Sequence, residues 1–299
     1  MGAIQEEALP PPGLHQPHSL HEAWKLKSAL GGSALYVSGG TLLRTQWEAG
    51  TVLMPKQLVD LRGVEGIGDI SLSEFHLTLG ALASLSQCRK NELMRTAAPA
   101  VQEAARCIAA PAVRNLATLG GNIASGFGDI LPALLVYDAE LVSYDGKFLA
   151  VQPLTDWLNS RWGGTKPAED IIAEVRIAPS VQESPGARRL EVFRKIGRRE
   201  AFTPSLVTVA ITATIDAGHQ ISGVRIAAGG GSGRPQRLGA AEAILEGAVY
   251  EESLLAILYE AVVNSFETYS DPFASEAYKK KTAGNLIVSE LWKSFNVKM

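Results

Sequence analysis

The stretch of sequence that decides the fold is Val113-Arg114-Asn115-Leu116-Ala117-Thr118-Leu119-Gly120-Gly121-Asn122-Ile123-Ala124-Ser125, followed by Gly128-Asp129-Ile130-Leu131-Pro132-Ala133-Leu134-Leu135. A second glycine pair lies upstream, in Val37-Ser38-Gly39-Gly40-Thr41-Leu42-Leu43. Paired glycines let the backbone turn sharply and approach a ligand closely, because no Cβ intervenes. The exposed amides of such a loop form an anion-binding nest. Two such loops would suit a diphosphate held from both sides, although an isolated glycine pair is also typical of a tight turn.

Neither glycine pair matches a standard nucleotide fingerprint. Neither has the Gly-x-Gly-x-x-Gly spacing of a Rossmann dinucleotide site, and neither ends in the Gly-Lys-Ser/Thr of a phosphate loop. A third glycine-rich stretch, from Gly229 to Pro235, follows an apolar segment and contains proline, so we expect it to be a connection and not a phosphate site. No Ser-His-Asp or Cys-His set predicts a covalent nucleophile.

Composition excludes several classes of protein. The chain has 299 residues, 46% of them hydrophobic, and a net charge of −3, which suggests two or three compact units and gives a nucleic-acid partner no electrostatic support. It has 2 cysteines, Cys88 and Cys107, which excludes an iron–sulfur cluster held by this chain alone. Unpaired thiols fit a reducing cytoplasm, and neither a signal peptide nor a membrane-spanning apolar run is visible. We therefore expect a cytoplasmic protein.

The pattern of apolar residues predicts two units in the first part of the chain. Residues 1–62 predict a small α/β unit, with a helix capped by Ser19 and its reciprocal partner Glu22. Strands are expected there at 34–37, 51–53 and 58–61. Residues 63–182 predict a larger α+β unit, with strand-like alternation up to residue 79, a strand at 141–144, and helices at 82–90, 99–109 and 131–137.

The last part of the chain predicts a third unit, at residues 183–299. Its beginning lies within a segment rich in proline and glycine, residues 178–188, where we place the boundary. Antiparallel strands are expected at 192–193, 206–215 and 221–227, followed by helices at 239–245, 253–266 and 274–295. Strands first and helices afterwards indicate an α+β unit.

The quoted run, with its downstream Gly-Asp-x-x-Pro, resembles the FAD-binding subunit of molybdenum hydroxylases. That family includes xanthine dehydrogenases, carbon monoxide dehydrogenases and aldehyde oxidoreductases. Supporting motifs follow in the family's order, at 14–23, 39–43 and 193–201, so the resemblance covers nearly the whole chain. It implies an α+β fold, in which a two-part FAD-binding region of the PCMH/vanillyl-alcohol-oxidase-like type precedes a C-terminal antiparallel-sheet domain.

The resemblance also implies roles for single residues, with FAD extended between the first two units. The pyrophosphate and adjoining hydroxyls would contact the two glycine loops, namely Val37, Ser38, Gly39, Gly40, Thr41, Leu42, Leu43, Thr118, Gly120, Gly121 and Asn122. Asp129 would accept from a flavin-side hydroxyl, or alternatively cap a helix that begins at Ile130. Ile108 would pack on the isoalloxazine ring, and is otherwise a core residue.

One further residue of the implied site is Lys195, which would place a cation near the pyrimidine edge of the ring and stabilise reduced, anionic flavin. Alternatively Lys195, Arg198 and Arg199 form an ordinary solvated face. The sequence departs from the family in three places. Ile108 is aliphatic where some members have Phe. Residues 123–128 are shorter than usual, and residues 202–205 read Phe-Thr-Pro-Ser where an acidic residue is usual.

The function that the resemblance implies is that of an FAD-dependent oxidoreductase subunit of the xanthine dehydrogenase type. Hydroxylation would occur on a molybdopterin-binding subunit, and a [2Fe–2S] subunit would pass electrons through FAD to NAD+. One alternative is the flavin subunit of a carbon monoxide, aromatic or aldehyde dehydrogenase with another acceptor. The other is a non-redox scaffold that has lost FAD, which the shortened segment before Asp129 would favour.

Overall fold

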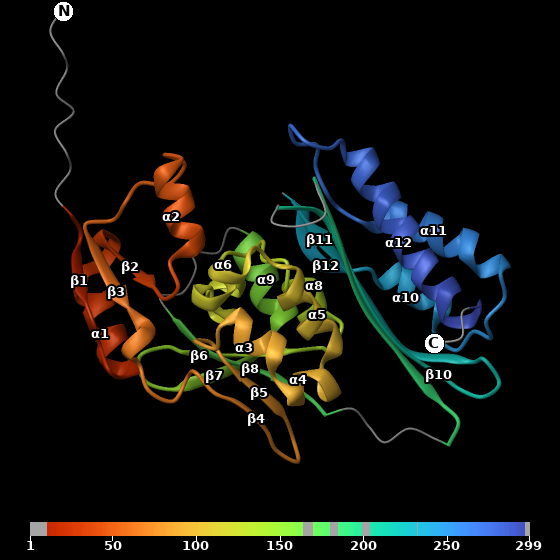
Figure 1. Ribbon diagram of the computed structural model, residues 1–299, viewed down its shortest axis with the longest axis horizontal. Coiled ribbons are helices and arrows are strands. Elements are labelled where there is room, and N and C mark those ends of the chain that lie inside the picture. The colour runs from red at the N-terminus through yellow and green to blue at the C-terminus, as the bar shows by residue number, and fades with distance from the viewer. Residues whose placement is uncertain (1–10, 164–169, 180–184, 199–203, 232, 297–299) are drawn as a thin grey trace, which may run out of the picture.

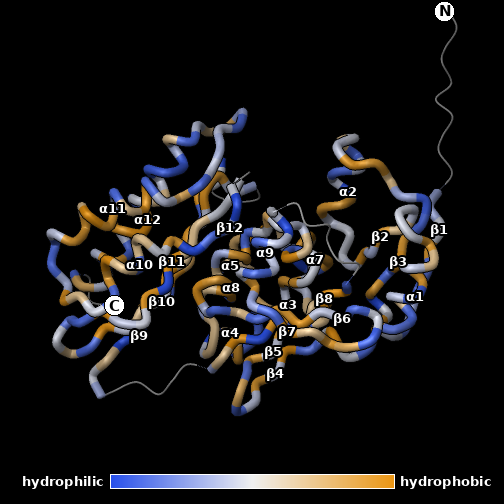
Figure 2. The backbone as a smooth tube through the Cα atoms, turned by 180° about the vertical axis from the view of Figure 1, so that it is seen from behind, coloured by the Kyte–Doolittle hydropathy of each residue, from blue (hydrophilic) through white to orange (hydrophobic). Residues whose placement is uncertain are grey.

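The computed structural model describes residues 11–163, 170–179, 185–198, 204–231 and 233–296. Three units lie in a row, each with its own sheet (Figure 1). Hydrophobic segments concentrate where the sheets meet their helices (Figure 2). No helix in the described ranges has both the length and the apolar character needed to cross a membrane. The predicted α+β architecture, with a C-terminal antiparallel sheet, is confirmed. The unit limits at 62 and 182 stay predictions.

The first sheet is parallel, in the order β1 (Gly13–His15), β3 (Gln57–Asp60), β2 (Ala34–Val37). Helix α1 (Leu20–Leu30) is capped by Ser19 as predicted, but the Glu22 carboxylate accepts from the amide of His18 and not from that of Ser19. The strand expected at 51–53 is wrong, because that segment is exposed and has no strand neighbour. Short 3-10 turns, η1 (Gly31–Ser33) and η2 (Leu61–Gly63), and the unpredicted helix α2 (Thr41–Glu48) complete the unit.

The second sheet has five strands, all of whose pairings are antiparallel. Their order is β4 (Ile70–Leu72), β5 (Leu77–Gly80), β8 (Ile171–Ile177), β6 (Glu140–Tyr144), β7 (Leu149–Pro153). The last strand in sequence, β8, therefore enters the middle of the sheet. The helices of this unit are α3 (Leu85–Lys90), α4 (Glu92–Ala97), α5 (Pro99–Cys107), α6 (Pro111–Leu116), α7 (Leu119–Ala124), α8 (Leu131–Leu135) and α9 (Leu154–Trp162).

The third sheet is antiparallel, in the order β12 (Gly233–Arg237), β11 (Ile221–Gly230), β10 (Ser205–Ile215), β9 (Arg188–Gly197). Helices α10 (Gly239–Leu245), α11 (Ser253–Ser265) and α12 (Glu276–Asn296) lie on the side of this sheet away from the second unit (Figure 1). Along β10, Val209 and Ile211 belong to the core under these helices, whereas Ala210 belongs to the core of the second unit. Alternate residues of β10 thus join the two units.

The glycine-rich stretch expected as a connection is mostly strand. Strand β11 continues to Gly230 and β12 begins at Gly233, so the sheet has one more strand than predicted. Gly230 and Gly231 have φ values of 99° and 60°, which allow the tight reversal between the two strands. Residue 232 of this stretch lies outside the described residues.

Candidate functional site

A cavity of about 360 Å³ lies between the first and second units. Val37 and Ser38, at the end of β2, line it together with Gly120 and Gly121 of α7. The hydroxyls of Ser38 and Thr118 are 2.9 Å apart and form a hydrogen bond that joins the two glycine loops. The sequence-predicted loops therefore meet at one cavity.

The first loop ends in the amino end of a helix. Gly40 is the N-cap residue of α2 and has φ of 65°, a conformation that favours glycine. No acceptor in the described part of the chain bonds the amides of Thr41, Leu42 and Leu43, the first residues of α2. Unpaired amides at a helix N-terminus, aligned with the helix dipole, attract anions. This loop has the free donors that the sequence predicts.

The second loop differs, because its amides are already bonded within the protein. The Gly120 amide donates to Ala81 O at 2.8 Å, the Gly121 amide to Thr118 Oγ1 at 3.1 Å, and the Asn122 amide to Thr118 O at 3.0 Å. The expectation of free amides is wrong for this loop. Its contribution is a bare surface, since a Cβ on Gly121 would meet only hydroxyls, the nearest being Thr118 Oγ1 at 3.0 Å.

A second cluster joins Asp129 to Lys195. The Lys195 ammonium lies 2.8 Å from Asp129 Oδ2 and donates to Cys107 O at 3.2 Å, and the two charged side chains are 10% and 13% exposed. Ser205 donates to the other Asp129 oxygen. Asp129 does not cap a helix, because α8 has Ile130 as its N-cap with no side-chain hydrogen bond. The cap role of Asp129 is therefore wrong. The solvated face is wrong for Lys195, whose side chain is 10% exposed, but Arg198 is exposed as that alternative expects.

Ile108 and Arg198 are the other residues that the sequence associates with Lys195. Ile108 is the C-cap of α5, is 9% exposed and belongs to the core of the second unit. It directly follows Cys107, so Ile108, Asp129 and Lys195 lie in one neighbourhood. The Arg198 guanidinium lies 4.1 Å from the centroid of the Phe273 ring, and Arg199 lies outside the described residues.

Asn122 connects the two parts of the predicted site. Its Oδ1 accepts from the amide of Ile130 at 3.4 Å, next to Asp129. Gly128 lies so close that a Cβ there would be 1.9 Å from the same oxygen. Ser125 closes the intervening turn by donating to Asn122 O at 2.6 Å. The Asn122 side-chain oxygen therefore holds the short segment 123–128 and presents Asp129 to Lys195.

Sequence reasoning missed several residues of the cavity wall. Trp157 and Arg161 come from α9 and Gln152 from β7, and Asp170 directly precedes β8. The Arg161 guanidinium lies 5.5 Å from the Trp157 ring centroid. Burial lowers the pKa of Arg161. Burial and Asp145 raise the pKa of Asp170. The only sequence signal was that residues 161–170, whose two ends line the cavity, are polar and rich in glycine. These ends reach the cavity because the next strand, β8, enters the middle of the sheet.

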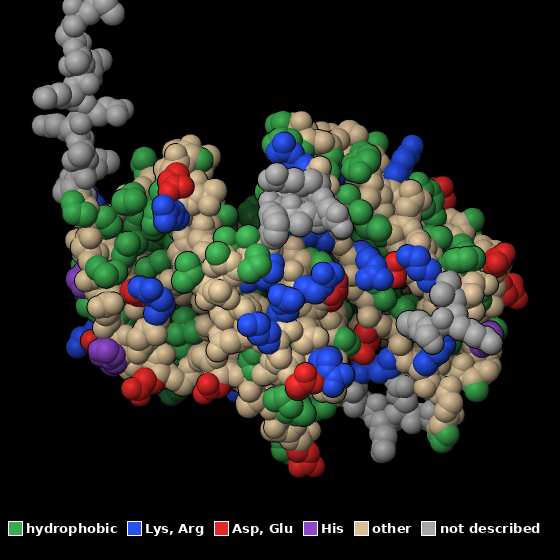
Figure 3. All heavy atoms as spheres, viewed as in Figure 1, with side chains coloured by type: hydrophobic (Ala, Val, Ile, Leu, Met, Phe, Trp, Pro, Cys, Tyr) green, Lys and Arg blue, Asp and Glu red, His purple; other side chains and the backbone are tan. Residues whose placement is uncertain are grey.

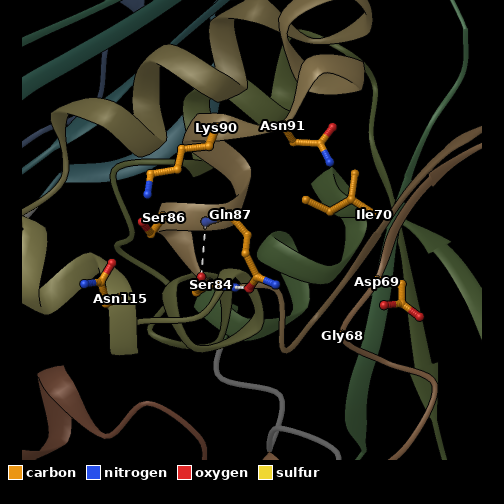
Figure 4. Close-up of a pocket in the computed structure, with 9 residues that line it drawn as sticks. All are labelled: Gly68, Asp69, Ile70, Ser84, Ser86, Gln87, Lys90, Asn91 and Asn115. Carbon is orange, nitrogen blue, oxygen red and sulfur yellow. Dashed lines mark hydrogen bonds between the residues drawn. The ribbon is translucent and has the colours of Figure 1, made fainter.

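A second hollow, of about 560 Å³, lies beside α3 (Figure 4). Ser84 and Gln87 line it and form the capping box of α3, and Lys90 and Asn115 reach into the same space. It contains none of the sequence-predicted site residues.

Comparison with known proteins identifies the family. The model of the FAD binding domain in molybdopterin dehydrogenase matches residues 8–180, and that of the CO dehydrogenase flavoprotein C-terminal domain matches residues 191–292. The chain belongs to the FAD-binding medium subunits of the molybdenum hydroxylases. The cofactor of this oxidoreductase subunit is therefore FAD, as predicted.

Individual relatives of this flavin subunit differ in their named activities. The chain is 24% identical to the nicotinate dehydrogenase FAD-subunit of Eubacterium barkeri, over 60% of each chain. It is 25% identical to a putative xanthine dehydrogenase FAD-binding subunit of Escherichia coli K12, over 75% of this chain and 76% of that one. A chain of carbon monoxide dehydrogenase from Hydrogenophaga pseudoflava has a TM-score of 0.86 and 23% identity, covering 96% of this chain and 99% of that one, which shows the fold.

The residues of the site fit an FAD molecule. Free amides at the start of α2 and the hydroxyls of Ser38 and Thr118 suit the oxygens of a diphosphate. The bare backbone of Gly121 leaves room for it, because only a hydrogen occupies the place of a Cβ. The cavity is within the size range of pockets that bind small ligands.

Proposed function

We propose that this chain is the flavin subunit of a heteromeric molybdenum hydroxylase of the xanthine dehydrogenase type. In the proposed complex, a molybdopterin-binding subunit hydroxylates the substrate, a [2Fe–2S] subunit carries the electrons to this chain, and NAD+ accepts them. FAD, when bound, supplies redox chemistry that links carriers of single electrons to an acceptor of a hydride. The observation that carries the proposal is the meeting of the two glycine loops at one cavity, with Asn122 connecting them to the Asp129–Lys195 pair.

The diphosphate, on this proposal, lies between the two glycine loops. The amides of Thr41, Leu42 and Leu43 donate to it from the start of α2. Gly121, on the opposite side, lets the ligand approach the backbone. Because the helix dipole favours negative charge at this end of α2, the site selects an anionic linker.

The adenosine end, we infer, enters the cavity lined by Trp157 and Arg161. The wall also includes the apolar side chains of Leu61, Leu82 and Ile171. Such a wall suits an aromatic base, and Arg161 places a positive charge near the phosphates without an ion pair to any described carboxylate. Residues that the sequence did not single out would thus hold this end.

The ring end lies toward Ile108, Asp129 and Lys195. Asp129 and Cys107 O hold the Lys195 ammonium in place, so its charge is fixed before the cofactor binds. A fixed cation favours negative charge at the nearby edge of the ring. Each Asp129 oxygen has a further lone pair and can also accept from a flavin-side hydroxyl.

The proposed cofactor site is tested by the visible spectrum of the purified chain. We expect a yellow protein with the two visible bands of oxidised flavin, and one FAD per chain. A colourless chain that takes up no added FAD would contradict the proposal and favour the scaffold without flavin. The short segment 123–128, the only support for that scaffold, is closed by hydrogen bonds around Asn122.

The proposed partners and acceptor are tested by purification from the native source. We expect partner chains that carry molybdenum and [2Fe–2S], and activity with xanthine and NAD+. A second candidate is a dehydrogenase for carbon monoxide or an aromatic or aldehyde substrate with another acceptor, because relatives named for other substrates match at similar identity. A complex inactive with xanthine and NAD+ that turns over one of those substrates would favour this candidate.

A further inference from the structure

The backbone that follows α5 is held by two cations. Lys195 Nζ donates to Cys107 O at 3.2 Å, and Arg114 Nη1 donates to Ile108 O at 2.8 Å. The same Arg114 nitrogen also donates to Ala109 O. Three successive carbonyl groups, from Cys107 to Ala109, are therefore bonded by an ammonium and a guanidinium.

This segment is in a conformation that needs support. Ala109 has φ of 46°, in the left-handed region that residues with a Cβ rarely adopt. The carbonyls at the end of a helix also carry the negative end of its dipole, and a cation close to them is stabilising. Without Arg114, two of these carbonyls would lose their partner, and the strained Ala109 would be free to relax.

Arg114 is an unusual residue for such a place, because it is 7% exposed. No described carboxylate forms an ion pair with it, and burial, together with the nearby Arg89 and Arg106, lowers its pKa. A buried charge without a counter-charge is costly unless its hydrogen bonds compensate. Lys and Arg side chains gather over the middle of the face in Figure 3.

We propose that Arg114 is a positioning residue for the flavin: it fixes residues 107–109 so that Ile108 packs against the isoalloxazine ring beside Lys195. The inference rests on the proposed function, which places the ring at Ile108 and Lys195. Arg114 acts through the backbone and need not touch the cofactor. Its charge, on the same short segment as that of Lys195, also adds to the positive potential at that end of the site.

The test compares Arg114→Met and Arg114→Lys with the control Arg89→Met in the full chain. Arg89→Met removes the same charge from a neighbouring arginine that, among the described residues, makes no hydrogen bond to residues 107–109, so it controls for the general loss of positive charge. Each variant is measured for FAD content, fluorescence of the bound flavin, rate of FAD release and midpoint potential. For Arg114→Met we expect retained FAD, stronger fluorescence, about tenfold faster release and a lowered potential, since two hydrogen bonds to a charged group are lost. The midpoint potential of Arg114→Lys should stay near that of the wild type, because lysine keeps the charge. Arg89→Met should match the wild type in all four measurements.

A second pair of variants tests the strain at Ala109. Glycine adopts a positive φ without cost, so Ala109→Gly should make the segment less dependent on Arg114. The release rate should then rise less when Arg114→Met is added to Ala109→Gly than when it is added to the wild type. Equal increases in the two backgrounds would overturn the role of the strained backbone.

The remaining outcomes are distinguishable. If Arg114→Met binds FAD with the fluorescence, release rate and potential of Arg89→Met, the inference is overturned. If Arg114→Met does not fold, Arg114→Lys decides: faster release at a potential near that of the wild type supports the inference, and wild-type values in every measurement overturn it. A wild-type chain that takes up no FAD contradicts the proposed function instead.

Discussion

The two glycine loops look alike in sequence, yet the structure uses them differently. The first passes from β2 into α2 and leaves the amides of Thr41, Leu42 and Leu43 without acceptors in the described chain. The second has bonded its amides to Ala81 and Thr118, and offers a surface without a side chain at Gly121. On the proposed function, a ligand between them would therefore be bound from one side by donors and accommodated from the other by free space.

Within each pair, moreover, the two glycines have different tasks. A Cβ on Gly39 would lie 2.0 Å from Leu116 O, and one on Gly120 would lie 2.7 Å from the Ala81 Cβ. Gly40 is needed for its positive φ, and Gly121 faces the cavity. One glycine of each pair thus serves close packing, so a glycine pair read from sequence does not by itself identify a ligand-binding residue.

The largest effect on folding is expected for Gly39→Ala. The added Cβ would overlap a backbone carbonyl, which cannot move without separating the two loops. We expect the free energy of unfolding to fall by about 3 kcal/mol or more, measured by urea titration. Gly32→Ala is the matched control, because a Cβ there meets nothing within 4 Å, and it should change stability by about 0.5 kcal/mol or less. Equal stabilities of the two variants would show that the loops do not pack as described.

The next effect is on the ligand alone, and it is expected for Gly121→Val. The branched side chain would enter the space that we assign to the diphosphate, so FAD should be lost. Stability should change by only about 1 kcal/mol, the order of a helix-propensity difference. The measurements are flavin absorbance per chain and the unfolding midpoint. Unchanged flavin content in a folded variant would remove the second loop from the site.

The smallest effect is expected at the opposite end of the site, for Lys195→Ala. The loops would still hold the diphosphate, so FAD should be retained, but the lost cation should lower the midpoint potential by roughly 30 mV, which corresponds to about 1.4 kcal/mol for a two-electron couple. Lys195→Arg keeps the charge and is the control. A potentiometric titration of Lys195→Ala that coincides with the wild type would count against a role of Lys195 at the ring.

Much of the fold was predictable from the sequence, because long periodic segments such as β10 and α12 show their structure locally. Helix α2 was missed because its first residues follow a glycine pair and were assigned to a ligand-binding loop, and because none of its residues is buried. Strand β12 was missed because its glycine and proline residues are typical of loops, and only pairing with β11 makes it a strand.

The candidate site was predictable to a lesser extent. The resemblance pointed to Asp129 and Lys195, but not to their ion pair, which depends on how β9 of the third unit meets the second. In the sequence, Ser205 stood out only because residues 202–205 depart from the family pattern. Its hydrogen bond to Asp129 also depends on how the third unit meets the second. Arg161 and Trp157 reach the cavity through the sheet topology, for which no local pattern exists.

The central claim is that FAD lies across the two glycine loops, with its adenosine end in the cavity between the first two units. It is tested most directly by titrating the flavin-free chain with FAD and with FMN, which lacks that end, and following flavin fluorescence. We predict one FAD per chain, bound at least about 100-fold more tightly than FMN, a difference of roughly 2.7 kcal/mol. Equal affinities for FAD and FMN, or no binding of FAD, would contradict it.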